Sequence, residues 1–478
     1  MPNIIFMKTF KIFHSGGFYT TNQKLEIRNP FNGEVIATTY LADEEVLETA
    51  IQSGLKATAA MKSLPSHKKY AILSGIAREI KERREAFAGL LSREAAKPLR
   101  YALGEVDRAI QTFTVAAEES KRLPKEYIDL DWTPAGEGKE GLVRYFPLGL
   151  IAGISPFNFP LNLAVHKIAP AIAAGNTIIL KPSSSTPLST LFLAEIIART
   201  ELPAGAVAVL PMDRKTGNRL VTDERIKLLS FTGSPAVGWK MKQNSGKKKV
   251  LLELGGNAAV IVSDSADLDN AVNKCLIGGF AYSGQVCIHA QRIYVHKNIF
   301  ADFSRKFVEK VKKLKMGPPQ DPETEISSMI DEANAIRVEA WVNEAVNDGA
   351  EILCGGKRKG TYYEPTVLSE THNDMKVCSL EVFGPVVTLE KFDDFQQALD
   401  WTNDSRYGLQ AGVFTNSIDE MNRAFEQLEV GGVIINDVPT FRVDHMPYGG
   451  IKDSGLGREG VKYALTEMME PKLLVKNK

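Results

Sequence analysis

A cysteine in a glycine-containing loop is the first residue whose type and setting could do chemistry. Cys287 stands in the string GQVCIHAQR, with glycine and glutamine before it and a strand-like run after it. Most unpaired cysteines are buried small hydrophobic residues, and we expect that of Cys275, Cys354 and Cys378. The polar lead-in to Cys287 favours access over burial, so Cys287 is the candidate for a nucleophilic thiol.

Three further strings hold polar groups beside rigid backbone. ELGGNAAVIV places Glu253 at the end of an apolar run, where a charge is costly unless it is exposed or used. SPFNFP places Asn158 between two aromatic residues and two prolines, a rigid platform from which an amide can point its NH₂ at an oxyanion. EVFGP places Glu381 on a turn made rigid by glycine and proline. Taken singly, each string also fits a surface carboxylate or an ordinary turn.

Two segments match the dinucleotide fingerprint G-x-G-x-x-G, namely 136–141 and 455–460. The fingerprint needs a strand before it and a helix after it. The first segment precedes a strand and the second follows the polar turn KDS, so we predict that neither cradles a phosphate.

The elements that must position these groups alternate between strand and helix. Alanine- and charge-rich stretches over 42–61 and 66–120 predict helices. The proline- and glycine-containing stretch 122–141 predicts a hairpin. Apolar strand runs then alternate with helices from 142–154 to about 253, and a second alternating region begins at AAVIV (258–262). This pattern predicts parallel sheets covered on both faces, which bind ligands beyond the carboxyl ends of their strands.

Length and composition limit the classes of protein. The chain has 478 residues, with Lys plus Arg equal to Asp plus Glu at 58 each. That balance argues against a nucleic-acid or membrane-surface partner, both of which need a basic excess. Four cysteines without metal-ligand spacing indicate no metal site and fit a reducing cytoplasm. Lys8 and Lys11 interrupt the apolar N-terminus, so we expect no signal peptide, and no apolar run is long enough to span a membrane.

The order of these strings along the chain is more informative than any one of them alone. PFNFP, LKPS, FTGS, ELGG, GQVC, EVFGP and PYGGIKDSGLGREG follow one another along nearly the whole chain. In this order they resemble the aldehyde dehydrogenase superfamily, whose members oxidise an aldehyde to an acid with NAD or NADP.

The resemblance implies a role for each matched residue. Cys287 matches the nucleophile, Glu253 the general base, and Asn158 the side-chain half of the oxyanion hole. Lys181 and Glu381 match the residues that hold the nicotinamide ribose, and Lys181 is also counted among the catalytic residues. The other cofactor-binding residues that it implies are Ile154, Ser155, Pro156, Phe157, Ser183, Ser184, Phe231, Gly233, Ser234, Val237, Leu254 and Phe383.

The resemblance also implies the architecture. We expect an α/β fold with a Rossmann-like cofactor domain (1–121 and 142–252), an α/β catalytic domain (253–445), and a β oligomerisation arm (122–141 and 446–478). We expect a homodimer or homotetramer.

Two alternatives for the function remain, a CoA-acylating aldehyde dehydrogenase and an inactive relative that only binds. Glu253 favours hydrolysis to a free acid, and the presence of Cys287, Glu253 and Asn158 argues against inactivity. Apolar residues flank Cys287. Arg108 lies in a helical stretch that borders the substrate entrance in the family, and we interpret it as an ordinary exposed arginine of that helix. We therefore expect small, mostly uncharged aldehydes of the lactaldehyde kind. Ser184 stands where NAD-preferring relatives carry an acid, and we therefore predict that NADP is used.

Overall fold

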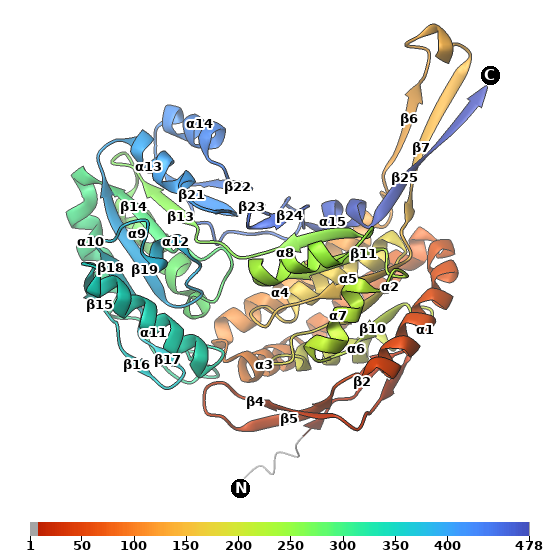
Figure 1. Cartoon of the computed structure of the whole chain (residues 1–478), viewed down its shortest axis with the longest axis horizontal. Coiled ribbons are helices and arrows are strands. Elements are labelled where there is room, and N and C mark those ends of the chain that lie inside the picture. Colours follow the sequence, from red (N-terminus) through yellow and green to blue (C-terminus); the bar gives the residue numbers. More distant parts are fainter. Residues whose placement is uncertain (1–7, 478) are drawn as a thin grey trace.

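A computed structural model describes residues 8–477 of the chain. Most of the N-terminal stretch in which we expect no signal peptide, residues 1–7, lies outside the described part. Two large sheets and a long projecting hairpin organise the molecule (Figure 1).

The larger sheet has eight strands in the order β24-β12-β11-β8-β9-β10-β2-β3. Its parallel centre consists of β8 (Leu150–Ile154), β9 (Thr177–Lys181), β10 (Val207–Val209), β11 (Leu228–Thr232) and β12 (Lys249–Glu253). Its edges are antiparallel: β2 (Ile12–His14), β3 (Gly17–Tyr19) and β24 (Gly455–Leu456).

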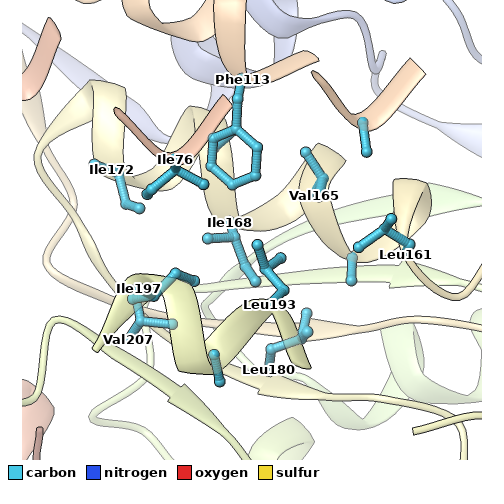
Figure 2. Close-up of a cluster of buried hydrophobic side chains, with 14 of the residues drawn as sticks. Ile76, Phe113, Leu161, Val165, Ile168, Ile172, Leu180, Leu193, Ile197 and Val207 are labelled. Carbon is cyan, nitrogen blue, oxygen red and sulfur yellow. The ribbon is translucent and has the colours of Figure 1, made fainter. Parts of the chain in front are cut away.

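Helices cover both faces of this sheet. The bounds are α1 (Glu44–Ser63), α2 (Ser66–Glu82), α3 (Arg84–Ala95), α4 (Leu99–Glu119), α5 (Asn162–Ala174), α6 (Leu188–Ile197), α7 (Arg214–Thr222), α8 (Pro235–Asn244) and α15 (Val461–Glu467). On one face Phe113 of α4, Ile168 of α5 and Leu193 of α6 pack over Leu180 of β9 (Figure 2). On the other face α1 and α7 form a second core. Burial of this apolar area is the main force that holds the helices on the sheet.

The second sheet has seven strands in the order β15-β18-β19-β14-β13-β21-β22. Their bounds are β13 (Ala259–Val262), β14 (Arg292–His296), β15 (Glu351–Cys354), β18 (Thr366–Ser369), β19 (Val386–Phe392), β21 (Gln410–Phe414) and β22 (Gly432–Ile435). Its helices are α9 (Leu268–Phe280), α10 (Lys297–Val311), α11 (Glu332–Asn347), α12 (Lys376–Ser379), α13 (Phe395–Asn403) and α14 (Ile418–Gln427). The predicted α/β class, with parallel sheets covered on both faces, is confirmed.

Short strands complete the body. They are β1 (Lys8–Thr9), β4 (Lys24–Arg28), β5 (Val35–Tyr40), β16 (Arg358–Lys359), β17 (Tyr362–Tyr363), β20 (Tyr407–Gly408) and β23 (Ile451–Lys452). The sequence patterns did not predict these strands, nor α11, α13 and α14.

The hairpin predicted over 122–141 is confirmed. It consists of β6 (Lys125–Asp129), the short turn helix Pro134–Gly136 and β7 (Lys139–Pro147), and β25 (Met469–Asn477) pairs with β7 along its whole length. The three strands project from the body together, with the C-terminus beside the hairpin (Figure 1). Within 446–468, β24 pairs with β12 and α15 packs on α5, so only β25 of the C-terminal segment lies in the arm.

One strand prediction is wrong. The run 142–154, predicted as a single strand, is divided into the end of β7 in the arm and β8 in the eight-stranded sheet. Gly149 between them adopts φ +118°, which side chains with a Cβ rarely tolerate. The Gly149 N–H donates to Asn176 Oδ1 at 2.8 Å, which holds the bend.

Candidate active site

A cavity of about 380 Å³ opens beyond the carboxyl ends of the eight-stranded sheet. The strand register explains how distant residues meet there. Lys181 stands beside Ile154, Ile154 beside Phe231, and Thr232 beside Glu253 on successive parallel strands. The predicted residues that line the cavity are Pro156, Phe157, Asn158, Gly233, Ser234, Glu253, Leu254, Cys287, Glu381 and Phe383.

The other predicted residues stand near this edge but do not line the cavity. Ile154 and Phe231 are buried strand ends. Lys181 ends β9, and Ser183 and Ser184 follow it. Ser155 is buried, and its N–H donates to the carbonyl of Lys181 at 3.1 Å. Val237, on α8, is 44% exposed.

The loop before Cys287 has an unusual backbone. Tyr282, Ser283 and Gly284 all have left-handed φ values, of 50°, 53° and 68°. A Cβ at Gly284 would lie 2.1 Å from the carbonyl oxygen of Gly384, so only glycine fits there. Such strained segments cluster at functional sites. Here the close approach joins the Cys287 loop to the turn that carries Glu381.

The Cys287 thiol lies against a tyrosine hydroxyl. Its Sγ is 3.1 Å from Tyr448 Oη. Burial raises the pKa of Cys287 to about 11, which Glu381 and Glu253 reinforce, while the Tyr448 hydrogen bond and Arg442 oppose the rise. Cys275, Cys354 and Cys378 are buried, as expected.

Glu253 ends β12 with its carboxyl group inside the protein. It is 5% exposed, and its Oε2 has no hydrogen-bond partner among residues 8–477. Burial first, and then the neighbouring Glu459, raise the pKa of Glu253 well above its usual range. A carboxyl group with a raised pKa is a stronger base once it is ionised.

Near Cys287 and Glu253 lies an ionic cluster of Lys167, Arg442 and Glu459, whose side chains are at most 4% exposed. Glu459 accepts from Lys167 Nζ at 3.2 Å and from Arg442 Nη2 at 2.9 Å. Burial alone would raise the pKa of Glu459, but the cationic groups around it, Lys167 first, lower it to about 2. Glu459 is therefore the ionised member of the Glu253–Glu459 pair at neutral pH.

Asn158 is held from behind by a second buried pair. Lys97 Nζ donates to the Asn158 carbonyl at 2.6 Å and pairs with Glu105, and both side chains are fully buried. The same ammonium lies 3.8 Å from the ring centroid of Phe159 and 4.5 Å from that of Tyr282. Lys97 thus contacts both the Asn158 loop and the loop that leads to Cys287.

The amide of Asn158 spans between these loops. Its Nδ2 donates to the carbonyl of Gln285 at 3.0 Å. An amide has two N–H donors, so one remains for a ligand in the cavity.

A second carboxyl group, that of Glu381, also lines the cavity. Glu381 Oε1 accepts from the Gly256 N–H at 3.1 Å, and burial raises the pKa of Glu381 to about 7. A Cβ at Gly255 would lie 2.1 Å from Glu381 Oε2, so glycine is required beside the carboxylate. The rings of Phe157 and Phe383 meet edge to face at 5.8 Å.

Helix α8 begins directly after two residues of the cavity wall. Ser234 precedes the helix without a side-chain capping bond, and Gly233 and Ser234 line the cavity. The first N–H groups of the helix therefore lack a side-chain partner at the cavity wall, a setting that favours an anion.

Arg108 does not line the cavity. Its guanidinium donates to Asp444 at 2.8 Å and lies 6.0 Å from the ring centroid of Phe159, the neighbour of Asn158. Its side chain is 27% exposed.

The sequence patterns missed part of the lining. Asn334, Arg337 and Trp341 of α11 face the cavity. Their spacing of three and four residues is that of one helix face, but no single string marked it. Tyr448 and Glu459 lie in the string PYGGIKDSGLGREG, but the sequence patterns assigned them no role. Arg442 precedes this string and was not singled out either.

Two features are absent from the described residues. None of the helices between residues 8 and 477 is long and apolar enough to cross a membrane. The same residues contain no cluster of three His, Cys, Asp or Glu side chains arranged to hold a metal ion.

Known proteins resemble the chain over nearly its full length. The family model described as "Aldehyde dehydrogenase family" matches residues 18–474. A 3-sulfolactaldehyde dehydrogenase of Priestia megaterium is 42% identical over 100% of both chains. A lactaldehyde dehydrogenase of Methanococcus aeolicus is 40% identical over 96% of this chain and 99% of its own.

Solved structures agree. Aldehyde dehydrogenase 21 of Physcomitrella patens, in complex with the reaction product succinate, superposes with a TM-score of 0.97 at 45% identity and covers 98% of each chain. A glyceraldehyde-3-phosphate dehydrogenase of Methanocaldococcus jannaschii with NADP has a TM-score of 0.92 at 40% identity, covering 96% of this chain and 100% of its own. Sequence, fold and site together place this chain in the aldehyde dehydrogenase family.

Proposed function

We propose that the chain oxidises an aldehyde to the carboxylic acid with NAD or NADP, through a thioester on Cys287. One observation carries the proposal. Cys287, Glu253 and Asn158 come from three different segments, yet all three line one cavity. The same cavity is lined by Glu381 and Phe383, and by Gly233 and Ser234 directly before the uncapped start of α8.

The residues present fit a dinucleotide. The uncapped N–H groups of α8 suit a pyrophosphate, and the glycine required at 255 leaves Glu381 close to the backbone. We assign the nicotinamide ribose to Lys181 and Glu381 and the nicotinamide ring to the side of Phe383. Ile154 to Phe157, Ser183, Ser184, Phe231, Val237 and Leu254 would shape the rest of the cofactor site. When bound, the cofactor supplies the hydride acceptor.

The side chains of the chain carry the other steps. The Cys287 thiolate adds to the aldehyde carbon, and the carbonyl electron pair moves onto oxygen. The free Asn158 N–H and the Cys287 backbone N–H donate to that oxyanion, a contribution worth about a hundredfold to a thousandfold per donor. After oxidation leaves a thioester, Glu253 takes a proton from water, and the hydroxide formed releases the acid and the thiolate.

Product analysis tests the reaction type. We expect the free acid as the main product even with CoA present, because Glu253 is placed to activate water. Mass spectrometry of the product mixture decides, and an acyl-CoA as the main product would establish the CoA-acylating alternative instead. Absence of NAD(P)H formation with a broad panel of aldehydes would favour the inactive alternative.

We further propose a short aldehyde with an anionic end as the substrate class, in place of the uncharged class expected from sequence. Relatives are named for 3-sulfolactaldehyde and aspartate semialdehyde, and the Physcomitrella enzyme holds succinate. Near Cys287, the buried Arg442 has an Nε without a partner among residues 8–477, and Arg108 stands by Phe159. Two guanidinium groups behind an apolar site favour a carboxylate or sulfonate.

A pair of matched aldehydes tests this class. Succinic semialdehyde and butyraldehyde have the same chain length and differ in the terminal carboxylate. We expect kcat/KM to favour the former by at least about tenfold, or 1.4 kcal/mol, and Arg108→Gln to reduce that preference. Arg100→Gln, on the same helix but paired with Glu325, is the control. Equal kcat/KM values for the two aldehydes would refute the anionic class.

For the cofactor we propose that NADP is used, alongside NAD or in preference to it. Ser184 offers a hydroxyl rather than a carboxylate, so nothing at this position repels a 2′-phosphate. Glyceraldehyde-3-phosphate dehydrogenases of Methanocaldococcus jannaschii and Bacillus halodurans hold NADP, and a betaine aldehyde dehydrogenase of Staphylococcus aureus holds NAD+.

We also propose that the arm joins copies of the chain into a homodimer or homotetramer. β25 and β22 each lack a neighbour on one edge among the described residues. Leu473, Leu474 and Val475 of β25 are 49%, 50% and 47% exposed. Exposed apolar edges recruit another strand. Light scattering should show a smaller particle for Leu474→Lys than for the exposed control Met316→Lys, and an unchanged mass would refute the arm as interface.

The division into domains accompanies this proposal. We propose 1–121 and 142–252 as the cofactor domain and 253–445 as the catalytic domain. In this scheme the cavity lies where the two units meet.

A further inference from the structure

We propose that Tyr448 is a catalytic residue that stabilises the Cys287 thiolate by donating its hydroxyl proton in a hydrogen bond, with Arg442 as the positioning residue behind it. The proposal rests on the proposed function only in taking Cys287 as the nucleophile.

The direction of the hydrogen bond follows from the chemistry of the pair. Tyr448 Oη and Cys287 Sγ are 3.1 Å apart. In the thiol form either atom can donate. Once the thiol proton has left for water, Sγ has only lone pairs, and the phenol is the sole donor of the pair. A hydrogen bond that gains strength on ionisation favours the ionised form.

The surroundings keep Tyr448 in its donor form. Its ring is 2% exposed and packs in an apolar cluster with Tyr282, Val286 and Ile288. Burial raises the pKa of Tyr448 well above its usual value, so the hydroxyl keeps its proton wherever the thiol can lose its own. No other hydrogen bond of this hydroxyl is found among residues 8–477.

Arg442 lies on the face of the same ring. Its Cζ is 3.6 Å from the Tyr448 ring centroid, within cation–π distance. Glu459 anchors the guanidinium from the other side at 2.9 Å. A cation on the ring face draws electron density from the phenol and makes its hydroxyl a better donor. It also fixes the plane of the ring, which aims Oη at Sγ.

The surroundings of Sγ act on the ionisation of the thiol in two directions. Arg442 and the Tyr448 hydroxyl favour the thiolate, while burial, Glu381 and Glu253 oppose it. A neutral donor in direct contact is therefore the closest group that offsets the carboxylates.

Alkylation of Cys287 by iodoacetamide tests the proposal without any aldehyde. The rate is measured against pH on the full-length protein without cofactor, by mass spectrometry of the Cys287 peptide. We expect Tyr448→Phe to move the midpoint of the profile upward by about one pH unit. The rate below the midpoint should fall about tenfold, equivalent to about 1.4 kcal/mol.

Tyr101→Phe is the matched control, because Tyr101 packs against the same apolar cluster, while the hydrogen bond to Sγ comes from Tyr448. Its midpoint should stay at the wild-type value. A Tyr448→Phe midpoint within about 0.2 unit of wild type would reduce Tyr448 to packing and overturn the proposal. A downward move would overturn it as well, because it would mean that the thiol donates to the phenol.

Arg442→Lys tests the positioning role with the same readout. It keeps the charge but loses the planar group over the ring. We expect an upward shift smaller than that of Tyr448→Phe, and little additional shift when both substitutions are combined. Shifts that simply add would show that Arg442 acts on Sγ independently of Tyr448. Turnover by Cys287→Ala would instead refute the proposed function, so the two failures are distinguishable.

Discussion

Around Cys287, the side chains of Lys167, Arg442 and Glu459 are at most 4% exposed and Glu459 pairs with both cations, whereas among the residues proposed to bind the cofactor Lys181 and Ser183 are partly exposed and Ser234 is exposed. The carboxyl groups differ in the same way. Glu253 has an unpartnered oxygen inside the protein, while Glu381 accepts from a backbone N–H.

The difference in burial fits the roles proposed for the two groups of residues. Groups that stabilise developing charge are most effective when they are already in place and shielded from water. Groups that hold a dinucleotide can stay hydrated until the ligand covers them. Substitutions near Cys287 should therefore reduce activity or stability more than substitutions among the residues proposed to bind the cofactor.

The largest expected effect comes from Cys287→Ala. Aldehyde oxidation should fall at least about a thousandfold, because no other group at the site can form the thioester. Titration with NADPH should give a dissociation constant within about twofold of wild type, because Cys287 is not among the residues proposed to hold the cofactor. Turnover above a few per cent of wild type would rule out the thioester route.

Glu253→Gln should slow the second half of the reaction. We expect kcat to fall by about 10² to 10⁴, with a rapid burst of NAD(P)H before the slow steady state. Because the pKa of Glu253 is raised, wild-type deacylation should increase with pH as the carboxyl ionises, and the variant should lose this increase. Stopped-flow absorbance measures both, and a missing burst would show that Glu253 acts before the thioester.

Removing the buried cation behind Asn158 should affect stability. Lys97→Met leaves Glu105 buried without its partner, which costs about 3–5 kcal/mol of unfolding free energy. Lys97→Met combined with Glu105→Gln should be less destabilised than the single variant. Chemical denaturation compares them, and a loss under about 1 kcal/mol in the single variant would show that the buried Lys97–Glu105 pair contributes little to stability.

At the cofactor end, Ser184→Glu should change selectivity rather than rate. A carboxylate there accepts from a ribose 2′-hydroxyl and repels a 2′-phosphate. We expect the NADP/NAD ratio of kcat/KM to fall at least about tenfold, or 1.4 kcal/mol. Ser185→Glu, at the exposed neighbouring position without a proposed cofactor role, serves as the control. A wild-type preference for NAD above about a hundredfold would contradict the reading of Ser184.

The smallest effect concerns pH and Glu381. Its pKa is raised to about 7 by burial, so the folded state holds the proton more tightly than the unfolded state. Stability from this group is present below about pH 4.5 and is lost as pH rises to about 7. Glu381→Gln should therefore match wild type at pH 4.5 and exceed it at pH 8 by on the order of 1 kcal/mol. Thermal melts at both values test the sign; a variant less stable at pH 8 would place Glu381 in a favourable ion pair.

Much of the fold could be predicted because hydrophobic periodicity and the positions of proline and glycine are local features of the sequence. The helical stretches predicted over 42–61 and 66–120 occur as α1 and as α2 to α4. The hairpin followed from its prolines and glycines. The break between β7 and β8 could not be predicted from such features. The residues before and after the break are apolar, and the two strands differ only in the sheet that they join. Helix α11 escaped notice although its cavity-facing residues have helical spacing.

The sequence by itself determined which residue types stand at the strand ends. Glu253 ends an apolar strand and Cys287 lies in a loop after glycine and glutamine, and those positions need only local order. What surrounds them was decided by tertiary structure. Tyr448 meets Cys287 across 161 residues, and Lys167 meets Glu459 across 292. A pKa depends on burial and on charges brought close in space, neither of which a sequence pattern contains. The chemical identity of the site is therefore local, whereas the protonation states that let it work arise only when the chain has folded.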